Sequence, residues 1–185
     1  GTEVQGGYEY DGNTYRGQNE FFNHPVSLTT CTGCHMQEGE GSHSFTPLLE
    51  RCTQCHPIGE GEEQSFENLS GSPGRNKRQI DMLSEQLLGQ LQAYAANSLG
   101  VPLVYAGDAY PYFFADVNGN GEHDEEDSRY ESFDAKSLKA AYNYQVAQKE
   151  PCGYIHNGIY IQQLLFDSIT DLGGTPAFSR PTESN

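Results

Sequence analysis

The stretch from residue 31 to residue 56 contains two CxxCH motifs, which constrain the fold more than any other feature of the chain. The motifs consist of Cys31, Cys34 and His35, and of Cys52, Cys55 and His56. In each motif the thiols lie one helical turn apart and can add to the vinyl groups of one haem, while the histidine ligates the iron. The sequence therefore predicts two covalently attached haem c groups. A zinc ribbon, in which each CxxC pair supplies half of a metal site, is the main alternative.

The composition fits a protein that is built around cofactors. A chain of 185 residues with only 35% hydrophobic residues has limited material for an apolar core, and two haems would supply part of it. The formal net charge of −16 argues against binding to nucleic acid or to anionic membranes. No apolar run is long enough to span a bilayer, and no signal peptide is visible. We expect an exported protein, periplasmic or extracellular, whose signal peptide has been removed.

Three segments have the apolar periodicity of helices, at about residues 76–99, 134–148 and 157–172. The second must end before Pro151, and the third stops at Gly173. The residues predicted to face inward are Ile80, Leu83, Leu87, Leu91 and Tyr94, then Leu138, Ala141, Tyr142 and Val146, then Ile161, Leu164, Leu165, Ile169 and Leu172. Residues 58–75 are rich in Gly, Glu and Ser and predict a surface connection. Residues 101–115 predict short extended pieces.

These patterns predict a mainly α fold with much loop and few short strands. We expect the haems at the N-terminal side of the domain and about three helices behind them. The dihaem domain spans residues 24–174, followed by a tail at 175–185. Residues 1–23 form an aromatic and Gly-rich arm, in which Asp11-Gly12 is typical of a type I′ hairpin turn. The arm is too apolar for a solvated tail, so we expect it to lie against its own domain or a neighbouring molecule.

The sixth ligand of each iron has few candidates. The remaining histidines are His24, His43, His123 and His156. Met36 directly follows a proximal histidine and cannot reach back over the ring, and Met82 lies near an inward stripe where a core methionine is usual. Bis-histidine ligation is therefore favoured. His156, at the start of a helix, is the first candidate, while His24 and His43 compete for the other iron.

Residues 116–127 match the pattern of a calcium-binding loop. The candidate ligands are Asp116, Asn118, Asn120, Glu122, Asp124 and Asp127. Gly121 permits the tight turn, but the twelfth position is Asp rather than Glu and no helix precedes the loop. We expect a structural Ca²⁺, with a solvated acidic loop as the alternative and His123 as a surface residue. Cys152 has the wrong spacing for a haem motif, so we expect a buried free thiol, or less readily an intermolecular disulfide.

The order of these motifs resembles the C-terminal part of multihaem c-type cytochromes. The two CxxCH motifs, HSFTP between them, KRQIDMLSEQLLGQLQAYAANSLG, FFADVNGNG and AAYNYQVAQKEPCGYIHNGIYIQQLLFDSI follow one another within residues 24–174. The chain is similar to long respiratory cytochromes of metal-reducing bacteria and, more distantly, to pentahaem nitrite reductases. The resemblance implies a fold of the multihaem cytochrome c type, in which a closely stacked haem pair packs against about three helices. It also implies that His156 serves the Cys31/Cys34 haem. The position matching His43 serves an earlier haem in the reductases, and this chain has none.

The missing earlier haem implies that His24 or His43 serves the second haem of its own chain or reaches a neighbouring subunit, as in cytochromes that polymerise. The catalytic haem of the reductases and its lysine-bearing motif are also missing, so nitrite reduction is not implied. We expect an electron-transfer protein rather than an enzyme, forming a homo-oligomer or filamentous homopolymer that exchanges electrons with redox proteins or extracellular acceptors. The alternatives are a soluble periplasmic carrier, a peroxidase or reductase with an open iron site, and a module organised by calcium.

Overall fold

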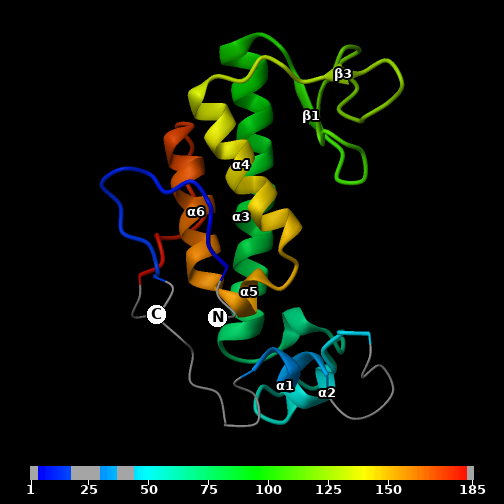
Figure 1. Ribbon diagram of the computed structural model, residues 1–185, viewed down its shortest axis with the longest axis vertical. Helices are drawn as coiled ribbons and strands as arrows, with labels where there is room; N and C mark the ends of the chain where they lie inside the picture. The colour runs from blue at the N-terminus through cyan, green and yellow to red at the C-terminus, as the bar shows by residue number, and fades with distance from the viewer. Residues whose placement is uncertain (1–3, 18–29, 37–43, 183–185) are drawn as a thin grey trace.

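The computed structural model describes residues 4–17, 30–36 and 44–182. Three long helices lie side by side and form the body of the molecule (Figure 1). They are α3 (Ser72–Tyr94), α4 (Ala135–Lys149) and α6 (Gly158–Asp171). Two short helices, α1 (Cys31–His35) and α2 (Leu49–Thr53), lie at one end of this bundle. None of the helices in the described ranges is long and apolar enough to cross a membrane.

A small antiparallel sheet lies at the other end of the bundle (Figure 1). Its strands are β1 (Leu103–Tyr105), β2 (Phe113–Ala115) and β3 (Ser128–Arg129), paired in the order β1-β2-β3. Leu103 pairs with Ala115, and Phe114 pairs with Arg129. The short extended pieces predicted within residues 101–115 are confirmed. The sheet places the loop 116–127 far from the cysteine motifs.

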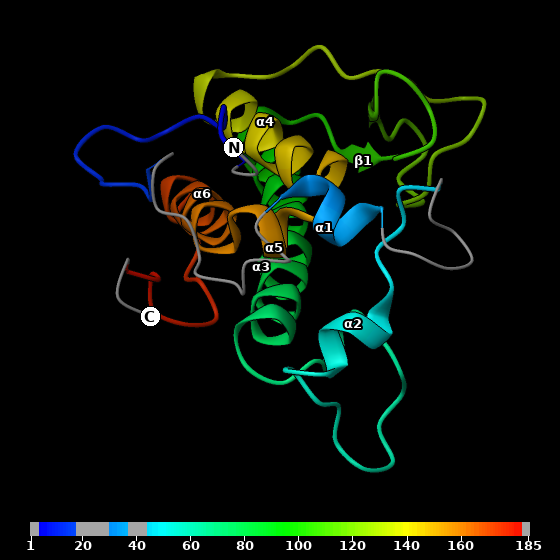
Figure 2. The same cartoon turned by 60° about the horizontal axis from the view of Figure 1, so that its bottom comes forward.

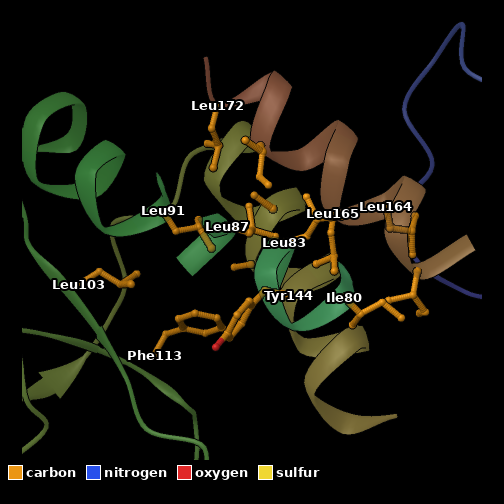
Figure 3. Packing of buried hydrophobic residues seen from close by; sticks show 14 of the residues in the cluster. Ile80, Leu83, Leu87, Leu91, Leu103, Phe113, Tyr144, Leu164, Leu165 and Leu172 are labelled. Atoms are coloured by element: carbon orange, nitrogen blue, oxygen red, sulfur yellow. The ribbon is translucent and has the colours of Figure 1, made fainter. Parts of the chain in front are cut away.

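Apolar side chains of all three helices meet in one core (Figure 3). On α3, residues three or four apart share one face, which turns toward α4 and α6. The residues that form this contact on α3 and α6 are Ile80, Leu83, Leu87 and Leu91, and Ile161, Leu164, Leu165 and Ile169. All of them are less than one-tenth exposed. The same holds for Leu172, which follows the last residue of α6. The inward faces predicted for the first and third helices are therefore confirmed, apart from Tyr94, which is only partly buried.

The prediction for the inward face of α4 was partly wrong. Leu138 and Tyr142 are 56% and 52% exposed, whereas Ala140 and Tyr144 are buried beside the predicted Ala141. Apolar residues occur on more than one face of this helix, so their identity does not fix its rotation. The alanines allow the close packing of α4 against α3 and α6 that a leucine at the same position would prevent.

Two other expectations along α3 need correction. The helix begins at Ser72, four residues earlier than predicted, because proline in the first turn of a helix loses no hydrogen bond and stabilises the helix start. The surface connection before it is shorter accordingly and contains a 3₁₀ turn at Phe66–Asn68. Met82 is 52% exposed, so it is not the core methionine that its position near the stripe suggested.

The arm residues 4–17 lie against α4 and α6. Tyr8 and Asn143 exchange two hydrogen bonds, with Tyr8 N donating to Oδ1 over 2.7 Å and Nδ2 donating to Tyr8 O over 3.0 Å. Tyr15 donates to Asp167 of α6 over 2.5 Å, and Arg180 donates to the same carboxylate over 2.8 Å. One buried carboxylate thus holds segments from both ends of the chain.

The turn in this arm is not the predicted type I′ hairpin turn. Asn13 N donates to Tyr10 O over 3.2 Å and closes a turn in which Gly12 has a φ of +85°. Asp11 is outside the left-handed region that a type I′ turn requires of both central residues. Within residues 4–17, no strand flanks this turn.

Candidate haem-binding site

Each CxxCH motif begins in a short helix, but α1 contains the whole first motif, whereas α2 ends at Thr53, before Cys55 and His56. Thr30 caps α1 by accepting the Gly33 N–H over 3.1 Å, and the helix places its two cysteines one turn apart. In the second motif, His56 N donates to Cys52 O over 2.8 Å and continues the helical turn beyond α2. None of the four motif cysteines forms a disulfide, and all are at least partly accessible. The prediction that the segment consists of short helical turns and loops is confirmed for its described residues.

The two motifs lie close to each other and to the short helix α5 (Gly153–His156). Burial raises the pKa of the Cys52 thiol, and the neighbouring Cys34 raises it further. Burial is the main reason that the pKa of Tyr154 on α5 rises to about 12, and Cys152 and Cys52 raise it further. Figure 2 shows α5 beside α1, between this short helix and the long bundle. Cys152 is a half-buried free thiol rather than a fully buried one.

His156 of α5 lies opposite His35 of α1. Their ring centroids are 6.2 Å apart, with an angle of 50° between the ring planes. Two imidazoles bound through nitrogen to one metal ion between them, at bond lengths of about 2 Å, have centroids roughly 6 Å apart. The spacing of this pair therefore fits two axial ligands of one iron, directly beside the cysteines of the first motif.

The hydrogen bonds of the site histidines fit metal ligation as well. Nδ1 of His35 lies 2.6 Å from the carbonyl oxygen of Phe45, and Nδ1 of His56 lies 3.0 Å from that of Ser70. Histidines that bind metals through one ring nitrogen usually donate the other N–H to a carbonyl or a carboxylate. The residues present therefore fit haem at both motifs, with Nε2 as the ligating nitrogen of each proximal histidine.

Sequence reasoning missed the groups that hold these histidines. Phe45 has a φ of +58°, an unusual conformation for a bulky residue, and it acts through its backbone oxygen. Neither its side chain nor that of Ser70 signals this role. Glu150 lies 3.0 Å from Nδ1 of His156 through its Oε1. Its only signal in the sequence is a carboxylate six residues before a candidate ligand.

The other candidate histidines do not add to this site in the part of the chain that the structure describes. His24 and His43 fall outside the described residues, so their assignment to the second haem stays a prediction. His123 lies in the loop between β2 and β3, at the opposite end of the bundle (Figure 1), so it is not a ligand candidate for either motif. His123 is exposed, as expected for a surface residue, and its ring stacks on Phe114 with centroids 3.8 Å apart.

The loop 116–127 has the tight turn of its sequence pattern. The Asp116 carboxylate is 8% exposed and accepts the backbone N–H groups of Gly119, Asn120 and Gly121 over 2.7–3.1 Å. Gly121 has a φ of +79°, as expected for the turn position. Side-chain amides of Asn118 and Asn120 donate to the Asp124 carboxylate, which lowers its pKa. Within the described ranges, no group of three or more His, Cys, Asp or Glu residues is arranged to hold a metal ion, so calcium binding stays a prediction.

The CxxCH motifs and the histidine pair beside the first of them fit covalently bound haem c, and similarity to known proteins agrees. The chain is 26% identical to the C-type polyheme cytochrome OmcB of Geobacter sulfurreducens over 199 residues, which cover 88% of this chain and 24% of OmcB. It is also 26% identical over 197 residues to the C-type polyheme cytochrome OmcC of the same organism. The chain spans about a quarter of the length of these relatives.

No protein-family model matches the chain, and no solved structure gives a significant match. The two relatives support the multihaem c-type cytochrome family and imply covalently bound haem c. They give no support to the more distant resemblance to nitrite reductases. They are consistent with a protein that is not an enzyme.

Proposed function

We propose that this chain is a dihaem c-type cytochrome that transfers electrons within a larger extracytoplasmic haem chain. The observation that carries the proposal is the facing pair of His35 and His156, with ring centroids 6.2 Å apart beside the first CxxCH motif. In this proposal, Cys31 and Cys34 hold the first haem and the two histidines bind its iron. Cys52, Cys55 and His56 hold the second haem. Haem supplies a carrier of one electron, and the protein tunes it through ligands, hydrogen bonds and burial.

The chain's own residues would orient the haems and supply the ligands of their irons. Nδ1 hydrogen bonds fix the tautomers of the histidines, so that Nε2 is the nitrogen that faces iron. A second histidine on the iron leaves no position at which a substrate can bind, which favours electron transfer over catalysis.

The second haem needs a distal ligand, and we propose that His24 or His43 provides it. His123 is the only described histidine that takes no part in the haem site, and it belongs to the loop between β2 and β3. The sheet that carries this loop lies at the far end of the bundle (Figure 1). If this ligand comes from a neighbouring subunit, the haems continue from chain to chain in a homo-oligomer or filament. Redox proteins or extracellular acceptors are then the partners, and the net charge of −16 favours basic surfaces on them.

The reaction of the reduced holoprotein with carbon monoxide tests this proposal. Because both irons are six-coordinate in the proposal, we expect two low-spin haems per chain and no rapid change in the visible spectrum on addition of carbon monoxide. Haem content is counted from the pyridine haemochrome spectrum and the mass of the chain. Rapid binding at either haem of the native assembly contradicts closed coordination and supports an enzyme with an open iron site. One haem per chain contradicts the dihaem assignment.

We also propose that residues 116–127 bind a structural Ca²⁺. The three backbone N–H groups that Asp116 accepts shape the loop as calcium-binding loops require. Calcium at 100 times its dissociation constant is expected to stabilise the holoprotein by about 2.7 kcal/mol, measured as a rise in Tm after chelator treatment. Asp116→Asn should abolish this response, whereas Asp108→Asn, which changes an exposed aspartate outside the loop, should retain it. A Tm of the wild-type protein that is the same with chelator and with millimolar calcium contradicts the site.

A further inference from the structure

The three site histidines differ in what their Nδ1 atoms contact. His35 and His56 contact neutral backbone carbonyl oxygens, of Phe45 and Ser70. His156 instead contacts the carboxylate oxygen Oε1 of Glu150 at 3.0 Å. A carboxylate acceptor makes a stronger, charge-assisted hydrogen bond than a carbonyl and increases the basicity of the ligand. The facing pair thus combines one histidine with a neutral partner and one with an anionic partner.

Local structure holds the Glu150 carboxylate in this position. The residue follows the last residue of α4 and precedes Pro151, so it lies in the turn between α4 and α5. Its Oε1 also accepts the Cys152 N–H over 3.3 Å, and its carbonyl accepts the Gly153 N–H over 3.0 Å. These bonds join the glutamate to the start of α5, the helix that ends at His156. The side chain is 32% exposed, so it is partly shielded from water.

The turn between α4 and α5 packs closely against α6. A Cβ on Gly153 would lie 3.2 Å from Cγ1 of Ile161 and 3.4 Å from Cγ of Glu150. The first distance is tighter than most contacts of real Cβ atoms, so α5 packs closely on α6 at this point. The turn that carries Glu150 therefore packs closely against α6 at the start of α5.

We propose that Glu150 is a positioning residue that holds His156 as the Nδ1–H tautomer and, through its charge, lowers the reduction potential of the haem that His156 ligates. This inference rests on the proposed function, since it requires iron between His35 and His156. The negative charge stabilises ferric iron relative to ferrous iron through the imidazole. One electron enters the iron on reduction, supplied by an external reductant, and no bond at His156 forms or breaks. The two haems of one chain are thereby given different potentials by different hydrogen-bond partners.

A redox titration of the holoprotein at pH 7, followed by visible and electron paramagnetic resonance spectra, tests this inference. Glu150→Gln keeps the size of the side chain and removes its charge. We expect both haems to stay low-spin, while the ferric/ferrous equilibrium of one haem shifts about tenfold toward ferrous, about 59 mV for a one-electron couple. The g values of that haem should move as well. Glu131→Gln removes an equal charge at an exposed position before α4 and should leave both potentials unchanged.

Glu150→Asp provides a second variant that does not depend on the first. It keeps the charge but shortens the side chain, so the same haem should shift in the same direction by less. Unchanged potentials in an assembled Glu150→Gln or Glu150→Asp protein overturn the inference, as does an equal shift in Glu150→Gln and Glu131→Gln. Failure of the proposed function is distinguishable, because His156→Ala would then leave both haems low-spin and closed to carbon monoxide.

Discussion

Replacing His156 with alanine is expected to convert one of the two haems from low-spin to high-spin iron. The substitution removes the ring that faces His35, so the first iron keeps only its proximal ligand. The open position should then bind carbon monoxide in the reduced protein. The second haem depends on other residues and should keep its spectrum. Visible and electron paramagnetic resonance spectra of the purified holoprotein should therefore show about half of the low-spin signal lost.

His123→Ala is the matched control for this experiment. It removes an imidazole of the same size from the loop between β2 and β3, at the other end of the bundle (Figure 1). We expect both haems of this variant to stay low-spin and closed to carbon monoxide. A His156→Ala protein with two unchanged low-spin haems would show that the facing pair does not ligate iron.

Leu87→Ala is expected to destabilise the folded holoprotein by about 3 kcal/mol. This value is within the range of about 2–5 kcal/mol for truncating a buried leucine to alanine. Leu87 is fully buried at the contact of α3 with the other long helices (Figure 3). Its truncation removes apolar contacts and leaves a cavity that three packed helices cannot collapse. Chemical denaturation of the haem-loaded protein, with both haems counted before the experiment, measures the loss.

Leu138→Ala separates this effect from the general loss of a leucine. Leu138 is on α4, where sequence periodicity predicted an inward position, but it is 56% exposed. We expect a change within about 0.5 kcal/mol, as for most surface substitutions. Equal destabilisation by the two substitutions would mean that the rotation of α4 described above is incorrect.

The helical part of the fold was largely predictable where one apolar stripe dominates. On α3 and α6, leucines and isoleucines recur at three- and four-residue spacing, and the same residues are buried in the structure. On α4 this reasoning failed at Leu138 and Tyr142, since small residues such as Ala140 take the tightest positions in the core. Which of several apolar faces packs inward depends on the shape of the partner helices, which a local pattern does not contain.

Only the local part of the proposed haem site was predictable from the sequence. The CxxCH motifs are local, so spacing alone predicts their short helices and proximal histidines. The approach of His156 to His35 depends on the packing of α5 and α6 against the rest of the chain, and a family resemblance rather than periodicity suggested it. The carbonyl of Phe45 is positioned by the conformation of its backbone, and the carboxylate of Glu150 by the turn between α4 and α5. No pattern of residue types encodes these contacts.

An anomalous difference map at the iron edge, from crystals of the haem-loaded protein, tests the central claim most directly. We predict two iron peaks per chain, one of them between His35 and His156 and bonded to Nε2 of both rings at about 2 Å, a typical metal–imidazole distance. The second peak should lie beside His56. A single peak, or two peaks with His35 and His156 on different irons, would contradict the account.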